Sequence, residues 1–471
     1  MQANGRLTIQ VLLNQRFLQN PNLIEITRFF GYARRVKGLS YAHDVQSGSH
    51  RLIEPTVIAT LGACRPATMP HLFPDLPSLT FASPTTHGYT SIFPLLIGPA
   101  LAELTLVCQR PIRGNQEDYY VALHSSLELL KRTASQLSVF VVKMTQGQDS
   151  ASLVTIFTRH VASWTSLRKI VVTLGGIGMP ACIWTLSTFR NLADAELVIL
   201  TDAIDLETVT FPTNAFPSLV NLTITSTISM LFLILRSMAS GTLKNVWVFL
   251  HEFCPIPTAS LQQLVQLVCH ASKDLHVFSL LVSAPESTRP VASLPTAAIL
   301  LPLLDHHNIQ ELIFEVGMPL LMTDTDVDTM ALVWPELRTL LLGVDDYNPL
   351  PDWKPRTTCR AITSALFHLT NLRMLGLEFD ASSLDALTVG GGQTEGVIDR
   401  RPGCLDDEPV RRSELEQLQV GWSLPGKPLT VACWIALMCP LLKDLTWHEA
   451  EGELEWRETK AMLEMLTWLE G

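Results

Sequence analysis

The stretch WPELRTLLLG, residues 334–343, contains the pattern that decides the fold. Its leucines Leu337, Leu340 and Leu342 follow a Leu-x-x-Leu-x-Leu spacing. The last two lie two residues apart, so they point to the same face of a strand. Pro335 precedes this strand and follows an apolar-periodic run, where it cannot extend a helix and biases Trp334 away from helical geometry. The stretch is therefore predicted to be a helix end, a stop and a strand with one buried face.

The same apolar spacing recurs along almost the whole chain. Successive anchors are about 24 to 43 residues apart, which leaves room for one strand and one helix per repeat. A weaker strand around Leu197 and Ile199 fills the one long gap. The thirteen good matches are Val36-Leu39-Tyr41, Leu76-Leu79-Phe81, Leu101-Leu104-Leu106, Leu137-Phe140-Val142, Leu167-Ile170-Val172, Leu219-Leu222-Ile224, Leu243-Val246-Val248, Leu275-Phe278-Leu280, Ile309-Leu312-Phe314, Leu337-Leu340-Leu342, Leu372-Leu375-Leu377, Leu415-Leu418-Val420 and Leu442-Leu445-Trp447. This density predicts a solenoid of about fourteen coils.

The proline stop and the helices recur in the same register. The stop appears as FPDL at Phe73, FPSL at Phe216, WPEL at Trp334 and CPLL at Cys439, and its leucine is always the first anchor of a strand. Between strands, apolar residues at helical spacing predict helices over residues 117–135, 152–164, 258–269 and 360–369. Each repeat is thus expected to contribute one strand and one helix.

These units resemble the irregular repeats of fungal F-box-type leucine-rich-repeat proteins, over roughly residues 30 to 450. The resemblance implies an α/β horseshoe with parallel strands on the concave face and helices on the convex face. Family members also carry an F-box, a short helical module that docks on a ubiquitin-ligase core. No F-box is recognisable in the 35 residues before Val36. Either the chain has lost that module or it begins downstream of it.

Three regions are expected. Residues 1–35 are predicted to be a helical N-terminal lead-in or cap, and residues 36–448 the solenoid. Insertions at 345–358 and 388–412 interrupt the period and are expected to be mobile loops. Residues 449–471 are acidic and then amphipathic, and are expected to cap the last repeat. The apolar stripe expected to cover that repeat is Leu454, Ala461, Met465 and Trp468.

The composition limits the classes of partner that the protein is expected to bind. The net charge of -11 argues against nucleic acid or an anionic membrane as the main partner. The longest apolar runs, such as residues 230–235 and 297–304, are far shorter than the ~20 residues that span a bilayer. No secretory signal is apparent, and the nine cysteines are scattered without a Cys-x-x-Cys pair. An intracellular protein, cytoplasmic or nuclear, with reduced thiols is therefore expected.

Signs of catalysis are weak, and no cofactor or metal is expected. A strand running into the glycine-rich loop 175–178, with Asp202 after the next strand, imitates a dinucleotide fold, although Pro180 falls inside the turn. Asp324, Asp326 and Asp328 begin like a calcium loop but lack its later residues, so they are interpreted as helix-capping residues. The pair at 306–307, both histidines, is interpreted as surface residues that close a helix.

Strand residues between the buried anchors should point outward onto the concave face. In the middle repeats these positions are unusually apolar, which is common for a partner site. The residues predicted to bind a protein are Trp247, Phe249, Val277, Leu281, Ile313 and Leu341. The opposing interpretation is that other segments cover this strip, or that the register is shifted by one residue.

The leading hypothesis is a non-catalytic protein-recognition scaffold related to the substrate-binding adapters of SCF-type ubiquitin ligases. Its expected partners are a protein on the concave face and, if an F-box is supplied upstream, a ubiquitin-ligase core subunit. Two alternatives remain. One is a nucleotide-cofactor enzyme that uses the loop 175–178, and the other is a structural repeat protein without a specific ligand.

Overall fold

A computed structural model shows a parallel α/β protein made of two compact units. One comprises residues 1–226 with 237–239, and the other residues 227–236 with 240–471. The residues that the structure describes are 23–42, 55–67, 69–83, 85–108, 116–144, 150–173, 179–199, 211–239, 241–251, 256–283, 294–344, 353–382, 384, 413–448 and 453–470.

The strands form a 14-stranded parallel sheet whose order follows the chain, from β1 to β14. They are β1 (Gly38–Ala42), β2 (Ser78–Ser83), β3 (Glu103–Cys108), β4 (Val139–Met144), β5 (Lys169–Thr173), β6 (Asp194–Val198), β7 (Asn221–Ser226), β8 (Asn245–His251), β9 (Val277–Ser283), β10 (Glu311–Glu315), β11 (Thr339–Leu342), β12 (Met374–Leu377), β13 (Gln417–Gln419) and β14 (Asp444–Thr446). Each predicted strand is present, including the weak one at β6, so the predicted solenoid-like α/β topology is confirmed.

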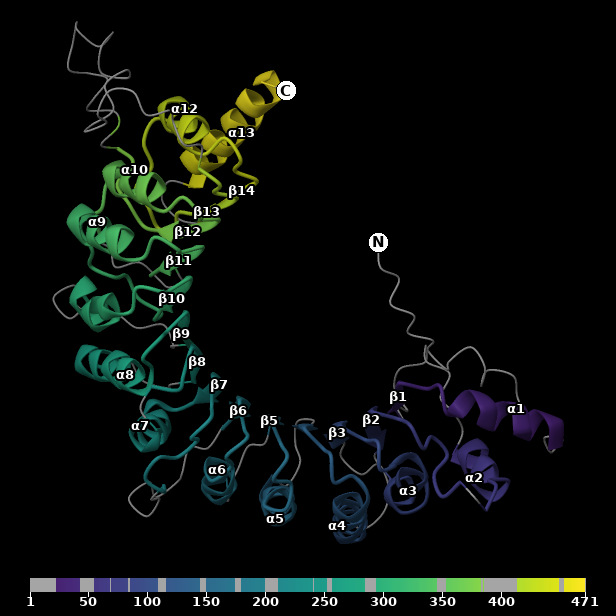
Figure 1. Cartoon of the computed structure of the whole chain (residues 1–471). Helices are drawn as coiled ribbons and strands as arrows, with labels where there is room; N and C mark the ends of the chain where they lie inside the picture. Colours follow the sequence, from purple (N-terminus) through teal and green to yellow (C-terminus); the bar gives the residue numbers. More distant parts are fainter. Residues whose placement is uncertain are drawn as a thin grey trace, which may run out of the picture. The chain divides into compact units, whose positions relative to one another are not determined.

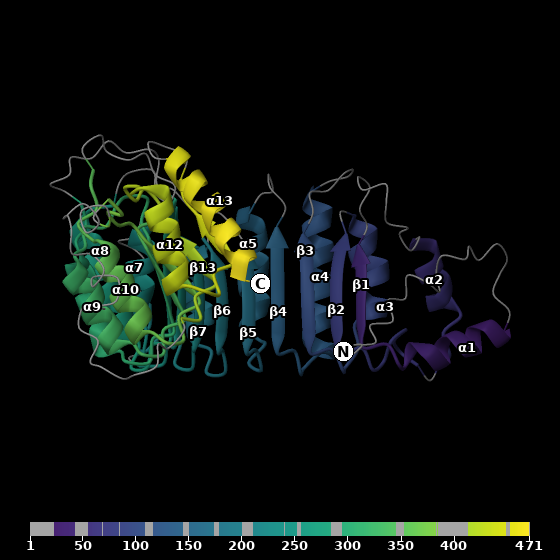
Figure 2. The same ribbon diagram turned by 90° about the horizontal axis from the view of Figure 1, so that it is seen from above.

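Helices alternate with the strands. They are α1 (Leu23–Ala33), α2 (Pro55–Ala63), η2 (Gly88–Ile92), α3 (Phe93–Leu96), α4 (Gln116–Thr133), α5 (Ser150–Val161), α6 (Met179–Ser187), α7 (Ile228–Ser237), α8 (Thr258–Ala271), η5 (Ala297–Asp305), α9 (Asp324–Val333), α10 (Cys359–His368), α12 (Pro428–Met438) and α13 (Glu453–Glu470). Figure 1 shows α3 to α6 on one side of β2 to β6 and, in the other unit, α8 to α10 on one side of β9 to β12. The view from above agrees for α3 to α5 (Figure 2). The other face of the strands, turned away from these helices, is called the open face below.

The inward anchors pair across neighbouring strands and form continuous buried rows. In the second unit one row runs through Val246, Phe278, Leu312, Leu340, Leu375, Leu418 and Leu445. In the first unit an equivalent row runs through Leu79, Leu104, Phe140, Ile170, Ala195 and Leu222. Burying one leucine side chain stabilises the fold by ~1.5–3 kcal/mol, so this ladder is the main source of stability.

The residue before each proline stop closes its coil in the same way. Trp334 is fully buried at the end of α9, and the Leu337 N–H donates to its carbonyl at 3.0 Å. Phe73, Phe216 and Cys439 are also buried, and each accepts a hydrogen bond from the N–H three residues on, at 3.1 to 3.2 Å. The predicted stop is therefore a repeated tight turn that leads into the strand.

The chain ends differ in detail from the sequence prediction. Residues 23–33 of the predicted N-terminal cap form α1, in which Phe30 and Ala33 are buried, and residues 1–22 lie outside the described residues. At the other end α13 packs on α12, but the predicted contact stripe is wrong for Leu454, Ala461 and Met465, which are exposed, and the side chain of Trp468 lies outside the described part. The buried residues of α13 are Trp456, Thr459 and Leu463, and the Trp456 Nε1 donates to the Ser423 carbonyl at 3.1 Å. Among the described residues, no helix is long and apolar enough to cross a membrane.

Candidate protein-binding face

The register of β8, β9 and β10 places the predicted binding residues in three adjacent rows on the open face. Trp247, Ser279 and Ile313 form the middle row. On one side of it lie Asn245, Val277 and Glu311, and on the other side Phe249, Leu281 and Glu315. Neighbouring strands lie ~4.8 Å apart, so side chains in one row are in contact range. The structure therefore brings five of the six predicted residues together.

These five residues form a partly exposed apolar surface, called the apolar strip below: Trp247, Phe249, Val277, Leu281 and Ile313. Phe249 is 38% exposed, and the other four are half-buried. Ser279, between Trp247 and Ile313, is only 1% exposed. Because serine is small, its burial follows from the larger side chains on either side. The strip is continuous across three strands.

Acidic residues edge the apolar strip on β10. Glu311 and Glu315 flank Ile313 along the strand and are half-buried. Glu311 pairs with Val277, and Glu315 pairs with Leu281. An apolar centre with carboxylates at its edge favours a partner that presents apolar and basic side chains.

The sixth predicted residue, Leu341, does not belong to the exposed strip. It is only 7% exposed, so the expectation that it lies open on the binding face is wrong. Its partner on β12 is Gly376, where a Cβ would lie 2.6 Å from Leu341 Cδ2 and 2.8 Å from Val344 Cγ2. The missing side chain at Gly376 leaves room for Leu341 and Val344 to lean over the strand, which buries Leu341.

The open face is also covered beyond β11. Glu378, directly after β12, is 6% exposed and is a buried carboxylate. The Trp353 Nε1 donates to its Oε2 at 3.0 Å, and the Trp422 N–H donates to its Oε1 at 3.1 Å. Thr357 also donates to the Glu378 carbonyl. A carboxylate can stay buried here because both oxygens have donors.

The segment before α10 supplies part of this cover. Trp353 and Thr357 are buried, and Thr358 caps α10, so residues 353–358 are packed structure rather than the expected mobile loop. Residues 345–352, and the whole of the second insertion, lie outside the described residues. The closed end is defined below by Leu341, Val344, Trp353, Glu378 and Trp422.

His448 lies against the closed end. Its ring stacks on Trp422 at 5.3 Å between centroids, and its Nε2 lies 2.7 Å from the Val344 carbonyl oxygen. Gly376 and Gly421 are the clue to this arrangement in the sequence. In the structure Gly421 has a φ of 52°, and a Cβ there would meet Glu378. Glycine at such positions allows close approach of neighbouring groups.

The dinucleotide interpretation has no support from the topology. The strands follow chain order throughout, whereas a doubly wound nucleotide-binding sheet reverses its order at a switch point. The loop 175–178 and Asp202 lie outside the described residues.

Of the three aspartates that resemble the start of a calcium loop, Asp326 caps a helix as predicted, whereas Asp324 contacts the next coil instead. Thr323 and Asp326 form a reciprocal capping box at the start of α9. Asp324 accepts hydrogen bonds from the backbone N–H and the hydroxyl of Thr358, both at 2.7 Å. These carboxylate oxygens thus join α9 to the next coil.

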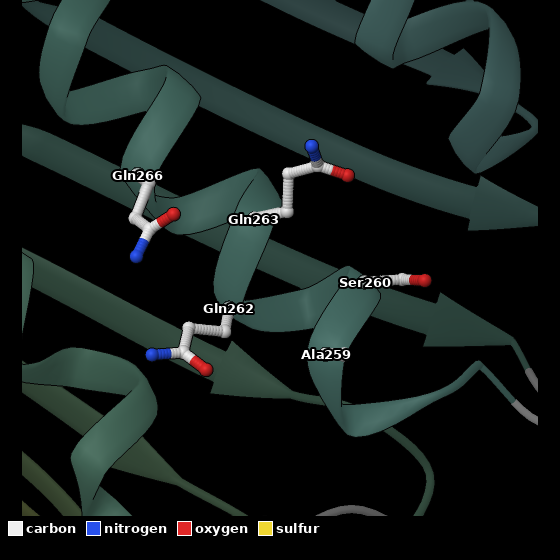
Figure 3. Close-up of a pocket in the computed structure, with 5 residues that line it drawn as sticks. All are labelled: Ala259, Ser260, Gln262, Gln263 and Gln266. Atoms are coloured by element: carbon white, nitrogen blue, oxygen red, sulfur yellow. The ribbon is translucent and has the colours of Figure 1, made fainter.

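The histidine pair after η5 splits into one buried and one exposed side chain. His307 is exposed as expected, but His306 is buried, so its predicted surface position is wrong. Burial lowers the pKa of His306. A shallow hollow lies on α8, beside Ala259, Ser260, Gln262, Gln263 and Gln266 (Figure 3). Because a single helix lines it, the hollow does not enclose a small molecule.

A cluster of three potential metal ligands was not predicted from the sequence. His124 and Glu128 lie four residues apart on α4, and His160 lies on α5. One ligand atom from each lies within 4.8 Å of the others. Burial lowers the pKa of His160 to about 4, so its ring is neutral at neutral pH. The spacing of His124 and Glu128 within one helix is a sequence clue, but His160 lies among apolar residues of another helix, so its sequence position does not indicate a ligand.

The sequence matches no model of a known protein family, and a search of curated proteins finds no match to it.

Proposed function

We propose that the protein is a non-catalytic recognition scaffold of leucine-rich-repeat type that binds another protein through the apolar strip. The observation that carries this proposal is the partly exposed, continuous apolar surface on β8, β9 and β10. Contiguous exposed apolar residues of this kind are uncommon on soluble surfaces, and aromatic residues are enriched at binding hot spots. A horseshoe, with this surface on its concave side, is the form that the proposal assigns to the solenoid.

The chemistry of the strip favours a partner with apolar side chains and a basic edge. Trp247 and Phe249 supply large contact areas with few rotatable bonds, which limits the entropy lost on binding. Glu311 and Glu315 add negative charge beside Ile313. A peptide or domain that carries Lys or Arg next to aliphatic residues complements both features.

A photo-crosslinking amino acid at position 249 tests the proposal directly in cells that make the protein. The matched control is the same amino acid at position 332, since Leu332 is exposed on α9 and faces away from the strip. We expect a discrete crosslinked partner from position 249 that is absent from position 332. The proposal is wrong if position 249 gives no crosslink beyond that of the control.

The relation to adapters of SCF-type ubiquitin ligases is a finer proposal that rests on the resemblance of the repeats. Its test is co-purification of the full-length protein with a ubiquitin-ligase core subunit, with the apolar strip intact and with Ile313→Glu. We expect both forms to retain the core subunit. Only Ile313→Glu should lose the crosslinked partner. Absence of the core subunit from both would remove the adapter role and leave the binding role standing.

A further inference from the structure

Three potential metal ligands meet where α4 and α5 pack in consecutive repeats. His124 and Glu128 lie one helical turn apart, so they share one face of α4. The His160 Nδ1 lies 3.5 Å from the Glu128 Oε1, and the rings of His124 and His160 lie 4.7 Å apart edge to face. Side chains from two elements therefore converge on one point at the border of the core.

His160 is the unusual member of this cluster. Its side chain is 0% exposed. Within the described part of the chain, neither ring nitrogen has a hydrogen-bond partner. Leaving a buried polar group unsatisfied is costly, and in native proteins such groups generally have a ligand, a water or a functional role. The convergence of three potential ligand atoms and the unsatisfied ring of His160 point to a missing ligand.

We propose that His124, Glu128 and His160 bind a divalent transition-metal ion of the zinc class. Two imidazoles and one carboxylate are a common ligand set for zinc, with a fourth position left for water. Zinc–ligand distances of ~2.0–2.1 Å place tetrahedral ligand atoms ~3.3 Å apart, close to the 3.5 Å between His160 and Glu128. The His124 and Glu128 side chains are half-buried, and their rotation can bring all three ligand atoms to this spacing.

Two neighbouring positive charges, those of Lys131 and Arg159, oppose the ion. The Arg159 Nη1 lies 3.2 Å from the His124 Nε2, and its charge disfavours a cation. Arg159 is exposed, so its side chain can turn away and release that nitrogen. An ion held by all three ligands joins α4 to α5 and thereby links two consecutive coils of the first unit. The site is independent of the apolar strip, which belongs to the second unit.

Zinc binding by the full-length protein, first stripped with a chelator, tests the proposal. Wild type is compared with His124→Gln and Glu128→Gln, which change half-buried positions and should fold. The matched control is His270→Gln, because His270 is exposed on α8. We expect wild type and His270→Gln to bind one more equivalent of zinc than the other two variants. Cobalt(II) should give the strong visible absorption of a four-coordinate site in the same two proteins only.

Thermal unfolding supplies a second readout. Zinc in excess should raise the Tm of wild type and of His270→Gln, but not of His124→Gln or Glu128→Gln. His160→Phe keeps a planar aromatic ring, although a larger one, and removes both nitrogens, and it should also lose the response to zinc. Equal zinc content in wild type, His124→Gln and Glu128→Gln, or no zinc bound by wild type, overturns the proposal.

Discussion

The apolar strip and the closed end are built from the same strand pattern, yet only the strip is exposed. Ile313 and Leu341 are direct neighbours in one cross-strand row and both point to the open face. Ile313 is half-buried, whereas Leu341 is buried. The next member of the row on one side is Ser279, and on the other side it is Gly376. An outward position thus becomes exposed or buried according to its neighbours.

Segments outside the strands decide the rest of the difference. Trp353 and Trp422 lie outside the strands and both donate to the Glu378 carboxylate, which fixes the cover over the closed end. No equivalent cover lies over β8 to β10 among the described residues, where Phe249 remains 38% exposed. The outward apolar residues of a strand therefore stay exposed only where no residue from another segment covers them and no glycine in the next strand lets them fold down onto it.

The largest effect is expected from a charge at Leu341. Leu341→Asp places an unpaired carboxylate in a buried site and should lower the free energy of unfolding by about 4 kcal/mol. Ile313→Asp changes a half-exposed neighbour and should cost only about 1 kcal/mol. Urea unfolding of both variants measures the difference. Similar losses would mean that the strip is part of the core and not a surface.

Removal of the buried carboxylate comes next. Glu378→Ala leaves the Trp353 Nε1 and the Trp422 N–H without their acceptor and should cost about 3 kcal/mol. Glu311→Ala, a half-exposed glutamate beside the strip, serves as the control and should change stability by less than about 0.5 kcal/mol. A neutral Glu378→Ala would show that the closed end is not held by this carboxylate.

Adding a methyl group at Gly376 tests whether the missing side chain at this position allows Leu341 to be buried. Gly376→Ala must displace Leu341 and Val344, so we expect a loss of about 2 kcal/mol. Gly38 is also in a strand, but nothing lies within 4 Å of a Cβ there, and Gly38→Ala should be neutral or slightly stabilising. If the two substitutions behave alike in thermal unfolding, the close approach over Gly376 does not explain the burial of Leu341.

The smallest effect concerns an exposed carboxylate near the strip. Hydrogen bonds from Asn308 and Lys244 lower the pKa of Asp274 to about 2. A lowered carboxyl pKa stabilises the fold above the unfolded value of ~3.9, and this contribution is lost as the pH falls towards 2. Because Asp274 is well exposed, Asp274→Asn should cost less than about 1 kcal/mol at pH 7. The cost should shrink towards pH 2; a cost that is constant with pH would exclude this origin.

The strands could be predicted from the sequence because each coil repeats the same spacing of buried apolar residues. The inward anchors such as Leu340, and even the weak strand at Leu197, were predictable from a period-two pattern that burial imposes. The apolar strip was predictable for the same reason, since outward positions alternate with inward ones. Its overall register is therefore confirmed by the burial of the anchors.

Contacts between distant segments could not be predicted in this way. The burial of Leu341 depends on Gly376, which lies on the next strand, and that of Glu378 depends on Trp353 and Trp422. His160 meets His124 only because the helices of neighbouring coils pack together. Spacing within one segment contains no information about these pairs.

The most direct test of the account measures stability and partner binding for one substitution, Ile313→Glu, beside Leu332→Glu on the exposed face of α9. The account predicts that both variants unfold within a few degrees of wild type, and that only Ile313→Glu loses the partner crosslinked from position 249. An Ile313→Glu protein that is unfolded, or one that is folded and binds the partner as wild type does, would contradict it.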